Sequence, residues 1–310
     1  MTTLYLTHES FVEHDTGPYH PESPDRIRSV ARALEQSVFS GLKREEAPRA
    51  SAQDIVRAHP GAYLDSLLKA IPEDGLRNID ADTVISPGSG EAMLRAAGAV
   101  VRAVDAVAAG EASRAFCAVR PPGHHAESLR PMGFCLVNNV AVGALHARAA
   151  HKYERVAVID FDVHHGNGTQ EIFWNDSKAF YASTHQYPFY PGTGGRNERG
   201  AHNNVVNVPL AAGSGPAAFR TGVSDEILPA LTAFKPDFIF ISAGFDAHKD
   251  DPLAQLRLTE SDFAWATAAL LDAAQKVCGG RVVSVLEGGY NLDALADCVT
   301  AHVETLSSIS

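Results

Sequence analysis

Short apolar runs that end abruptly in polar or glycine-rich residues constrain the fold of this chain more than any other feature of its sequence. These runs cover residues 3–6, 115–119, 156–159, 179–183, 238–242 and 282–286. Their residues are apolar at successive positions instead of alternating, which is typical of parallel strands buried on both faces. Stretches with helical periodicity separate them, at residues 90–109, 140–150, 216–234 and 259–278. Alternating strands and helices predict an α/β fold built on a mainly parallel sheet.

Length and composition limit the number of domains and the kinds of binding partner that we expect. The 310-residue chain has no repeat and no linker rich in proline or glycine, so we expect a single domain over residues 1–310. Its 37 acidic and 26 basic side chains give a formal net charge of −11, which disfavours binding to nucleic acid or to an anionic membrane.

No apolar stretch approaches the ~18 residues of a membrane span, and the N-terminus lacks the pattern of a signal peptide. The four cysteines form no Cys-x-x-Cys pair. We therefore expect a reduced, cytoplasmic enzyme, and the sequence leaves a homo-oligomer open.

The segment DFDVHHGNG at residues 160–168 follows one of these strands and carries the strongest chemical signal. Residues two apart in an extended segment point the same way. Asp162 and His164 can therefore offer a carboxylate and an imidazole to one cation, with Asp160 on the same side. Asp246 follows another apolar run and supplies a third ligand. A lone Asp-x-His would indicate loop residues bonded to the backbone, but this combination predicts a site for zinc or another divalent transition metal.

Two further segments at strand ends predict acid–base and oxyanion chemistry. The segment RPPGHH at residues 120–125 holds two adjacent histidines on a backbone that proline and glycine make rigid and tightly turned. Such a pair suits proton transfer from an attacking water and to a leaving group. The segment EGGYN at residues 287–291 delivers Tyr290, whose phenol can donate to a developing oxyanion. We assign its glycines, Gly288 and Gly289, to close contact with substrate. Taken alone, this last segment fits a glycine turn with a packing tyrosine equally well.

Two weaker signals concern aromatic and basic residues. Phe189 and Tyr190 lie between prolines and fit either loop packing or the walls of a pocket. Arg26 and Arg28 follow a proline and predict ion pairs at the start of a helix.

Several segments, taken together and in order, resemble the zinc-dependent histone deacetylase superfamily. They are HPE at residues 20–22, RPPGHH at 120–125, GFCLVNN at 133–139, DFDVHHGNG at 160–168, FYPGTG at 189–194, GFD at 244–246 and EGGYN at 287–291. Their sequences are most similar to the class II branch, which includes bacterial deacetylase-like amidohydrolases and acetylpolyamine amidohydrolases. The resemblance implies an arginase-type α/β fold with a central, mostly parallel eight-stranded sheet and helices on both faces.

The resemblance also implies two kinds of bound cation. One zinc ion would be held by the three residues already singled out, Asp162, His164 and Asp246. A structural monovalent cation, usually potassium in this family, would be held by Asp160, Ser183 and Thr184. Whether the native transition metal is zinc or iron stays open.

The catalytic roles follow from the same resemblance. His125 would be the general base, and Asn167 would bond it. His124 would be its electrostatic partner, oriented by Asp160. Tyr290 would donate to the oxyanion. Another branch of the family carries aspartate at the position of Asn167, so the sequence leaves the proton affinity of His125 open.

Three positions would shape the substrate tunnel. Phe134 and Tyr190 would flank a narrow channel for an acylated lysine, although phenylalanine is usual at the second position. Leu253 stands where polyamine-specific relatives can carry an acidic residue, just after an Asp-Pro pair. A leucine there cannot pair with a cationic polyamine.

The expected function is hydrolysis of the amide of N-acetyl-lysine, or of a related acyl-amine in a peptide or small molecule, to acetate and a free amine. The first alternative is an amidohydrolase for acetylpolyamines or other small amides with the same mechanism. A binuclear manganese ureohydrolase would need two Asp-x-His-x-Asp stretches, and only one partial copy is present. A catalytically inactive acyl-binding module would lack the histidine pair or Tyr290.

Overall fold

The computed structural model describes residues 2–308, and an eight-stranded sheet runs through its centre. The strands of this sheet are β1 (Thr3–Thr7), β2 (Lys43–Glu46), β5 (Arg114–Cys117), β6 (Val156–Asp160), β7 (Ala179–Gln186), β8 (Val205–Leu210), β9 (Phe238–Ala243) and β10 (Val282–Leu286). They pair in parallel in the order β2-β1-β5-β10-β9-β6-β7-β8. A separate antiparallel pair is formed by β3 (Arg77–Asn78) and β4 (Val84–Ile85).

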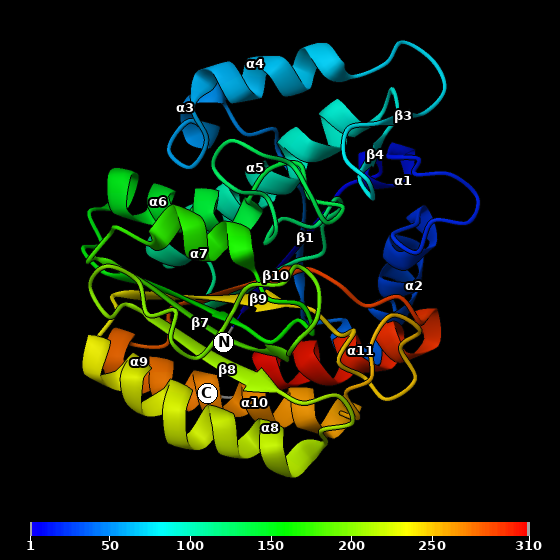
Figure 1. Cartoon of the computed structure of the whole chain (residues 1–310). Coiled ribbons are helices and arrows are strands. Elements are labelled where there is room, and N and C mark those ends of the chain that lie inside the picture. The colour runs from blue at the N-terminus through cyan, green and yellow to red at the C-terminus, as the bar shows by residue number, and fades with distance from the viewer. Residues whose placement is uncertain (1, 309–310) are drawn as a thin grey trace.

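Helices cover both faces of the sheet. The α-helices are α1 (Ser10–Glu13), α2 (Pro24–Ala33), α3 (Ala52–Ile55), α4 (Gly61–Ala70), α5 (Ser89–Ala108), α6 (Asn139–His151), α7 (Asn167–Phe173), α8 (Pro216–Gly222), α9 (Leu228–Phe234), α10 (Glu260–Cys278) and α11 (Leu292–Ser308). Figure 1 shows α5, α6 and α7 on one face, with α3 and α4 outside them, and α8 to α11 on the other. The predicted α/β architecture is therefore confirmed. No helix within residues 2–308 is long and apolar enough to cross a membrane.

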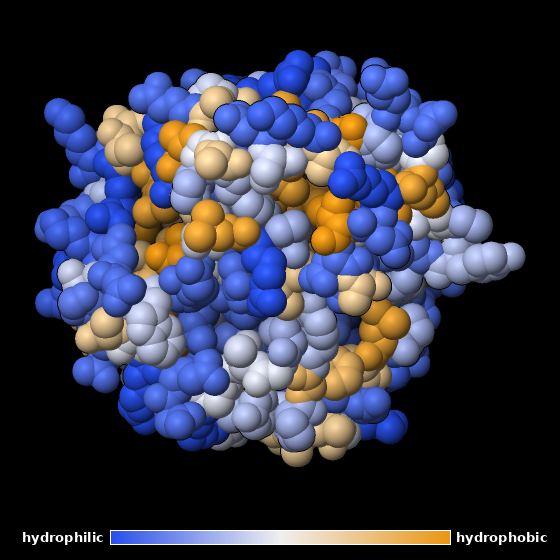
Figure 2. Space-filling model, turned by 45° about the horizontal axis from the view of Figure 1, so that its top comes forward, coloured by the Kyte–Doolittle hydropathy of each residue, from blue (hydrophilic) through white to orange (hydrophobic). Residues whose placement is uncertain are grey.

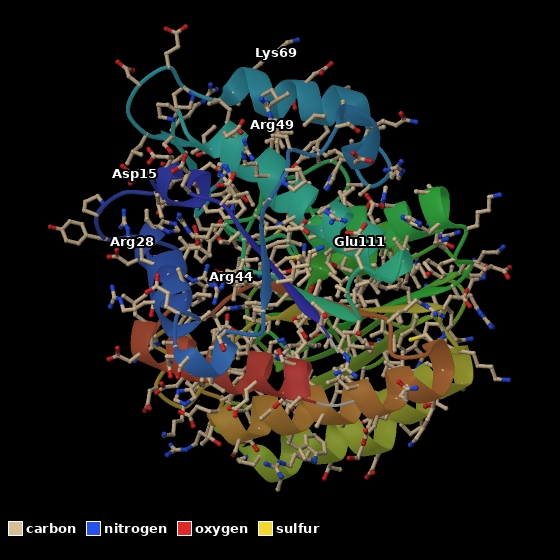
Figure 3. All side chains as sticks on the ribbon, turned by 180° about the vertical axis from the view of Figure 1, so that it is seen from behind. Asp15, Arg28, Arg44, Arg49, Lys69 and Glu111 are labelled. Atoms are coloured by element: carbon tan, nitrogen blue, oxygen red, sulfur yellow. The ribbon has the colours of Figure 1, made fainter. Side chains whose placement is uncertain are left out.

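The predicted strands are all present, and two further strands, β2 and β8, complete the sheet at its edges. Neither has a continuous apolar run. The sequence of β2 is KREE, and charged residues are typical of edge strands because they discourage pairing with another chain. Its Glu45 pairs with Arg102, and its Lys43 pairs with Glu111. Strand β8 contains Pro209, which an edge strand tolerates. Figure 3 labels Arg44 of β2 and the nearby Glu111.

The predicted helix at residues 216–234 is the one element that departs from a regular α-helix. It is divided into α8, a π-helical segment (Val223–Ile227) and α9. The other three predicted helices correspond to α5, α6 and α10, with ends that differ by at most one residue.

The core lies between the sheet and its helices. Every residue of β5, β6, β7, β9 and β10 is buried. Small residues bring α6 close to α5, since a Cβ added at Gly143 would lie 2.3 Å from Cγ1 of Val100. On the face shown in Figure 2, apolar residues form small separate groups among polar ones. Charged side chains such as Arg28 and Lys69 lie at the periphery in Figure 3.

The strand order explains where a functional site can form. Strands β5, β10, β9 and β6 are neighbours in the sheet although they lie far apart in the chain. Because they are parallel, their carboxyl ends meet at one edge, which is where open α/β sheets bind ligands. The segments that follow these strands carry the motifs DFDVHHGNG, RPPGHH, GFD and EGGYN.

Candidate active site

The three predicted ligands of the transition metal converge where β6 and β9 end. Nδ1 of His164 lies 3.1 Å from Oδ1 of Asp162 and 3.1 Å from Oδ2 of Asp246. The ligand atoms of these buried residues all lie within 4.8 Å of one another. Strand pleating does not produce this convergence, because β6 ends at Asp160 and the chain then bends. Contrary to expectation, Asp160 does not join the cluster, since its carboxylate faces His124 instead.

The chemistry of this cluster fits a divalent transition metal. One imidazole and two carboxylates are a mixed donor set that such ions accept, and their charge of about −2 offsets the ion. Burial and then the Asp162 carboxylate raise the pKa of Asp246 to about 7. Burial opposes protonation of His164, but the two carboxylates outweigh it and raise the pKa of His164 to about 10. A positive charge is therefore favoured between these groups.

The histidine pair lies beside the cluster, and its members have different partners. Nδ1 of His124 lies 3.0 Å from Oδ2 of Asp160, and Nδ1 of His125 lies 2.8 Å from Oδ1 of Asn167. The two ring centroids are 4.0 Å apart. Burial opposes protonation of His124, but the nearby aspartates outweigh it and raise its pKa to about 10. Burial and the neighbouring imidazoles lower the pKa of His125 well below its ordinary value. The pair thus joins a positive imidazolium to a neutral imidazole.

Asn167 determines which nitrogen of His125 carries the proton. Nδ2 of Asn167 donates to Oε1 of Glu127 over 2.8 Å, so its amide oxygen faces the histidine. Nδ1 of His125 then donates to that oxygen, and Nε2 is left free to accept a proton.

Glycines next to the metal cluster make room for its carboxylates. The backbone N–H of Gly288 donates to Oδ2 of Asp162 over 2.8 Å. A Cβ at position 288 would lie 2.2 Å from Oδ2 of Asp246, and one at Gly244 would lie 2.0 Å from Oδ2 of Asp162. The structure therefore puts Gly288 against the carboxylates, and Gly289 packs against Leu295 and Phe245. Their predicted contact with substrate stays a prediction.

A pocket of about 210 Å³ opens onto these groups. Its lining consists of Asp82, His125, Gly133, Phe134, His164, Tyr190, Leu253 and Tyr290. The ring of Phe134 packs edge-on against Tyr290, with centroids 5.9 Å apart, and Tyr190 packs in the same way against His125 at 5.1 Å. Phe134 has a φ of 69°, a strained value for a bulky residue that is found mostly at functional sites.

Tyr290 and Leu253 are positioned by one carboxylate. Oδ2 of Asp251 accepts the backbone N–H of Tyr290 over 2.7 Å, and Oδ1 accepts that of Leu253 over 3.0 Å. The guanidinium of Arg26 lies over the Tyr290 ring, 5.0 Å from its centroid. Tyr290 and Leu253 therefore share a support, which was not predicted from the sequence.

The residues implied for a monovalent cation lie together on β6 and β7. Asp160 and Ser183 are partners in the register of the two strands, and Thr184 follows directly. All three are buried. Oδ2 of Asp160 also accepts from the hydroxyl of Tyr181 over 3.0 Å. A potassium ion at this place stays a prediction.

Only part of a buried charge cluster beneath the site was predicted from the sequence. Arg28 does form an exposed ion pair near the start of α2. Arg26 also forms the predicted ion pair, because its Nη1 lies 2.8 Å from Oε1 of Glu22, but this pair is fully buried. Nε of Arg120 donates to the same oxygen over 2.6 Å. Arg26 also donates to the carbonyl of Gly289 over 2.7 Å, so this cluster supports the turn that carries Tyr290.

Glu287 is a second residue that sequence reasoning missed. Its Oε2 accepts the backbone N–H groups of Gly123 and His124 over 2.7 and 3.1 Å, and its Oε1 accepts from Ser242 over 3.0 Å. It thus links the ends of three neighbouring strands. Its place at the head of the EGGYN segment was the only signal for it.

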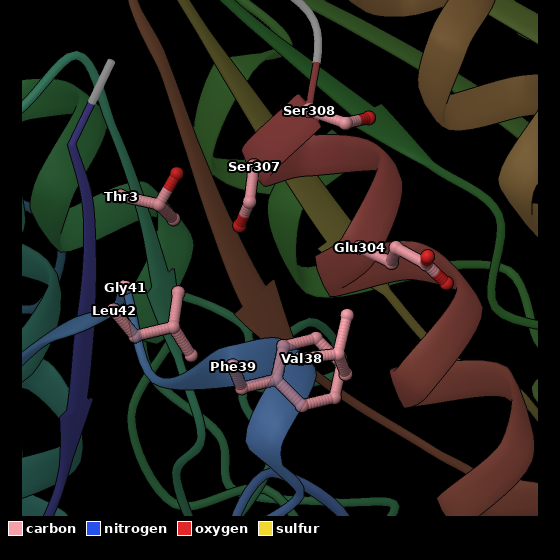
Figure 4. Close-up of a pocket in the computed structure, with 8 residues that line it drawn as sticks. All are labelled: Thr3, Val38, Phe39, Gly41, Leu42, Glu304, Ser307 and Ser308. Atoms are coloured by element: carbon pink, nitrogen blue, oxygen red, sulfur yellow. The ribbon is translucent and has the colours of Figure 1, made fainter.

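A larger cavity lies at the opposite end of the sheet, where β1 begins. Its volume is about 300 Å³, and Figure 4 shows its lining between the start of β1 and the end of α11. That lining consists of Thr3, Val38, Phe39, Gly41, Leu42, Glu304, Ser307 and Ser308. Glu304 is its one ionisable side chain, so this cavity does not offer the chemistry found at the other end of the sheet.

A parallel α/β sheet that carries an Asp–His–Asp cluster, a histidine pair and a tyrosine at its carboxyl edge defines a class of hydrolases that use a metal ion. Residues 20–306 match the family described as "Histone deacetylase domain". The chain is 42% identical over 311 residues to a "Histone deacetylase-like amidohydrolase" of Pseudomonas aeruginosa, which covers 99% of this chain and 82% of that protein. It is 40% identical over 311 residues to "Histone deacetylase 14, chloroplastic" of Arabidopsis thaliana, over 93% of this chain and 73% of that one.

Structural similarity agrees with these matches. The crystal structure of the HDA15 HD domain superposes with a TM-score of 0.92 at 34% identity, over 99% of this chain and 89% of that chain. The chain therefore belongs to the histone deacetylase family and is a hydrolytic deacetylase. The cytoplasmic location expected from the sequence stays a prediction.

Proposed function

We propose that this enzyme is a zinc-dependent deacetylase that hydrolyses the side-chain amide of N-acetyl-lysine in peptides or proteins and releases acetate. The observation that carries the proposal is that His125, His164 and Tyr290 face one pocket of about 210 Å³. The aromatic rings of Phe134 and Tyr190 line the same pocket. Rings on its walls favour a slender apolar chain, such as the methylenes of lysine, with a polar amide at its end.

The proposed metal ligands are Asp162, His164 and Asp246. A divalent metal bound to them would polarise the amide carbonyl and lower the pKa of the attacking water. We therefore expect loss of the metal to abolish nearly all of the activity.

The chain's own residues supply the proton transfers. Nε2 of His125 accepts a proton from the attacking water, because Nδ1 of the same ring donates to Asn167. The hydroxyl of Tyr290 donates to the carbonyl oxygen as negative charge develops on it. His125 then returns this proton to the departing nitrogen, and Asp160 orients the neighbouring His124. The amide C–N bond breaks to give acetate and a free amine.

Hydrolysis of acetylpolyamines by the same mechanism is the second candidate. One observation favours it: the carboxylate of Asp82 lines the pocket and could pair with an ammonium group. Leu253, which lines the same pocket, opposes it because an apolar side chain offers no partner to a buried charge. Oδ1 of Asp82 already accepts the backbone N–H of Gly133 over 3.1 Å, so we place acetyl-lysine first.

The metal is tested with Asp162→Ala. We expect this variant to bind one zinc ion fewer per chain than the wild type, by elemental analysis, and to lose activity. Chelator-treated wild type should regain activity with zinc. An active variant with unchanged metal content would contradict the ligand assignment. Recovery with ferrous iron but not with zinc would contradict the choice of metal.

The substrate is tested by competition. Acetyl-lysine peptides and acetylated polyamines are offered together, and kcat/KM is compared for the two. We expect the peptide to be preferred. A preference for the polyamine would move the second candidate to first place.

A further inference from the structure

A second cluster of metal-ligating side chains lies on the helical layer, away from the pocket. It joins Asp105 of α5 to His146 and His151 of α6. Nε2 of His146 lies 2.7 Å, and Nε2 of His151 lies 2.6 Å, from the same carboxylate oxygen, Oδ1 of Asp105. One ligand atom from each residue lies within 4.8 Å of the other two. Two imidazole nitrogens thus converge on one carboxylate oxygen.

The backbone that carries these residues is firmly packed. Figure 1 shows α5 and α6 on the same face of the sheet. They are in direct contact along their length, and Gly143 of α6 lies so close to Val100 of α5 that a Cβ would clash. His151 is the last residue of α6, and Lys152 then takes a left-handed conformation that ends the helix. The ligand positions are therefore fixed by two helices that cannot separate without disrupting the core.

A second carboxylate stands behind His146. Nδ1 of His146 lies 3.6 Å from Oδ1 of Asp54. Asp54 is itself held by the N–H of Ser51 at 2.9 Å and by Arg57 at 2.5 Å. Histidines that bind metals through one nitrogen commonly donate the other N–H to a carboxylate, which orients the ring and strengthens the ligand. Nη1 of Arg57, which can only donate, lies 3.2 Å from Nδ1 of His146, so this nitrogen accepts and Nε2 carries the proton. Metal binding through Nε2 would place the proton on Nδ1, break this contact and leave Arg57 paired with Asp54.

Exposure increases across the cluster and leaves a path for an ion. The side chain of His146 is 9% exposed, that of His151 is 28% exposed, and that of Asp105 is 43% exposed. The innermost ligand is therefore buried and oriented, while the outer two can be reached from solvent. Positions not filled by protein would be open to water.

We propose that Asp105, His146 and His151 form a second, peripheral binding site for a divalent transition metal such as zinc, cobalt or nickel. Two imidazoles and one carboxylate suit these ions better than calcium or magnesium, which prefer oxygen ligands. A bound ion ties the end of α6 to α5. The site is separate from the catalytic one, because α6 has 13 residues, about 20 Å at 1.5 Å per residue. The helix begins near the histidine loop, where Asn139 bonds the carbonyl of Pro121, and ends at this cluster.

The alternative for the same residues is a clamp of hydrogen bonds between two histidines and Asp105, with no ion. The metal site and the clamp predict different numbers of metal ions bound per chain. Chelator-treated protein is titrated with Co²⁺, and bound metal is followed by visible absorption and by elemental analysis. We expect two equivalents for the wild type. His151→Gln and Asp105→Asn should each weaken one equivalent at least about tenfold, a change that loss even of an outer partner of a metal ligand commonly produces.

Control variants separate this site from the catalytic one. His202→Gln removes an exposed imidazole elsewhere and should keep both equivalents. His151→Gln should retain deacetylase activity, because it lies outside the pocket. Asp162→Ala should keep the peripheral equivalent, and the double variant Asp162→Ala/His151→Gln should bind none tightly. Circular dichroism checks that each variant is folded, and Asp105→Asn serves as the second variant should His151→Gln prove unstable.

A wild type that binds one equivalent would overturn the proposal and leave the hydrogen-bonded clamp. Two equivalents that persist unweakened in both His151→Gln and Asp105→Asn would overturn it as well. These outcomes do not depend on the proposed substrate or on which metal serves catalysis.

Discussion

His125 donates its Nδ1 proton to the amide oxygen of Asn167 over 2.8 Å, so the proposed general base rests on a neutral partner. Its neighbour His124 faces the carboxylate of Asp160 instead. An amide stabilises one tautomer of the imidazole without stabilising the charged form as a carboxylate does. The contrast keeps His125 ready to accept a proton, whereas His124 stays charged.

We expect Asn167→Asp to shift the pH dependence of activity. His125 must be neutral to act as a base, so kcat/KM rises as the pH passes upward through its pKa. A carboxylate beside Nδ1 favours the charged imidazole and raises that pKa, by about one unit or more. The acidic limb of the kcat/KM profile should therefore move to higher pH by about the same amount. Asn175→Asp adds the same charge at an exposed position and should leave the profile in place. Superimposable profiles for the wild type and Asn167→Asp would show that this contact does not set the pKa.

Replacing Tyr290 by phenylalanine should lower kcat without unfolding the protein. The phenol lines the pocket beside His164, and loss of one oxyanion donor costs about 10²–10³-fold in kcat. Tyr190→Phe is the matched control, since it removes a hydroxyl from the other aromatic wall and should have a small effect. If Tyr290→Phe stays within about threefold of wild-type kcat, the tyrosine only packs against Phe134.

Leu253→Glu should shift selectivity toward acetylated polyamines. Leu253 lines the pocket, and a carboxylate there could pair with an ammonium group of the polyamine. We expect the ratio of kcat/KM for polyamine to that for acetyl-lysine peptide to rise by about tenfold, or about 1.4 kcal/mol. Leu253→Gln, which is polar but uncharged, should change the ratio less. An unchanged ratio in Leu253→Glu would mean that selectivity comes from another residue, and Asp82→Asn would then be the next variant to measure.

Because Glu22 is buried and paired with Arg26 and Arg120, the free energy of unfolding should depend on pH in the acidic range. Burial opposes ionisation of Glu22, but the two guanidinium groups outweigh it and lower its pKa to about 2 from 4.5. A depressed folded-state pKa contributes stability above about pH 4.5, and this contribution is lost as the pH falls toward 2. Glu22→Gln should lower the free energy of unfolding at neutral pH by about 3–5 kcal/mol, because it leaves buried positive charge uncompensated.

Urea unfolding between pH 2 and 7 checks this expectation. Glu22→Gln should also flatten the pH dependence of stability below about pH 4.5. The exposed pair of Glu154 and Lys178 provides the control, since Glu154→Gln should leave stability nearly unchanged. A Glu22→Gln variant as stable as the wild type at neutral pH would show that the cluster is not structural.

Local sequence was sufficient to predict the elements that are buried on both faces. Residues 156–159 and 238–241 are continuously apolar, and burial on both sides of a parallel sheet requires this. Edge strand β2 was not predicted, because a strand that faces solvent carries charge and lacks the pattern. The direction of Asp160 was also mispredicted. The residue belongs to the strand, whereas Asp162 and His164 lie in the bend that follows, so alternation no longer relates them.

The sequence by itself determined which residues follow each buried strand, and so the set of carboxylates, imidazoles and the phenol available at one edge of a parallel sheet. Only the tertiary structure decided which of them meet. The order β5-β10-β9-β6 makes neighbours of segments far apart in the chain, and strand order depends on long-range packing that no local pattern encodes. The same holds for the burial of Arg26 and for the junction of α5 and α6 at Asp105. Both depend on what lies across the interface, because a side chain's partner is chosen by the elements packed against it.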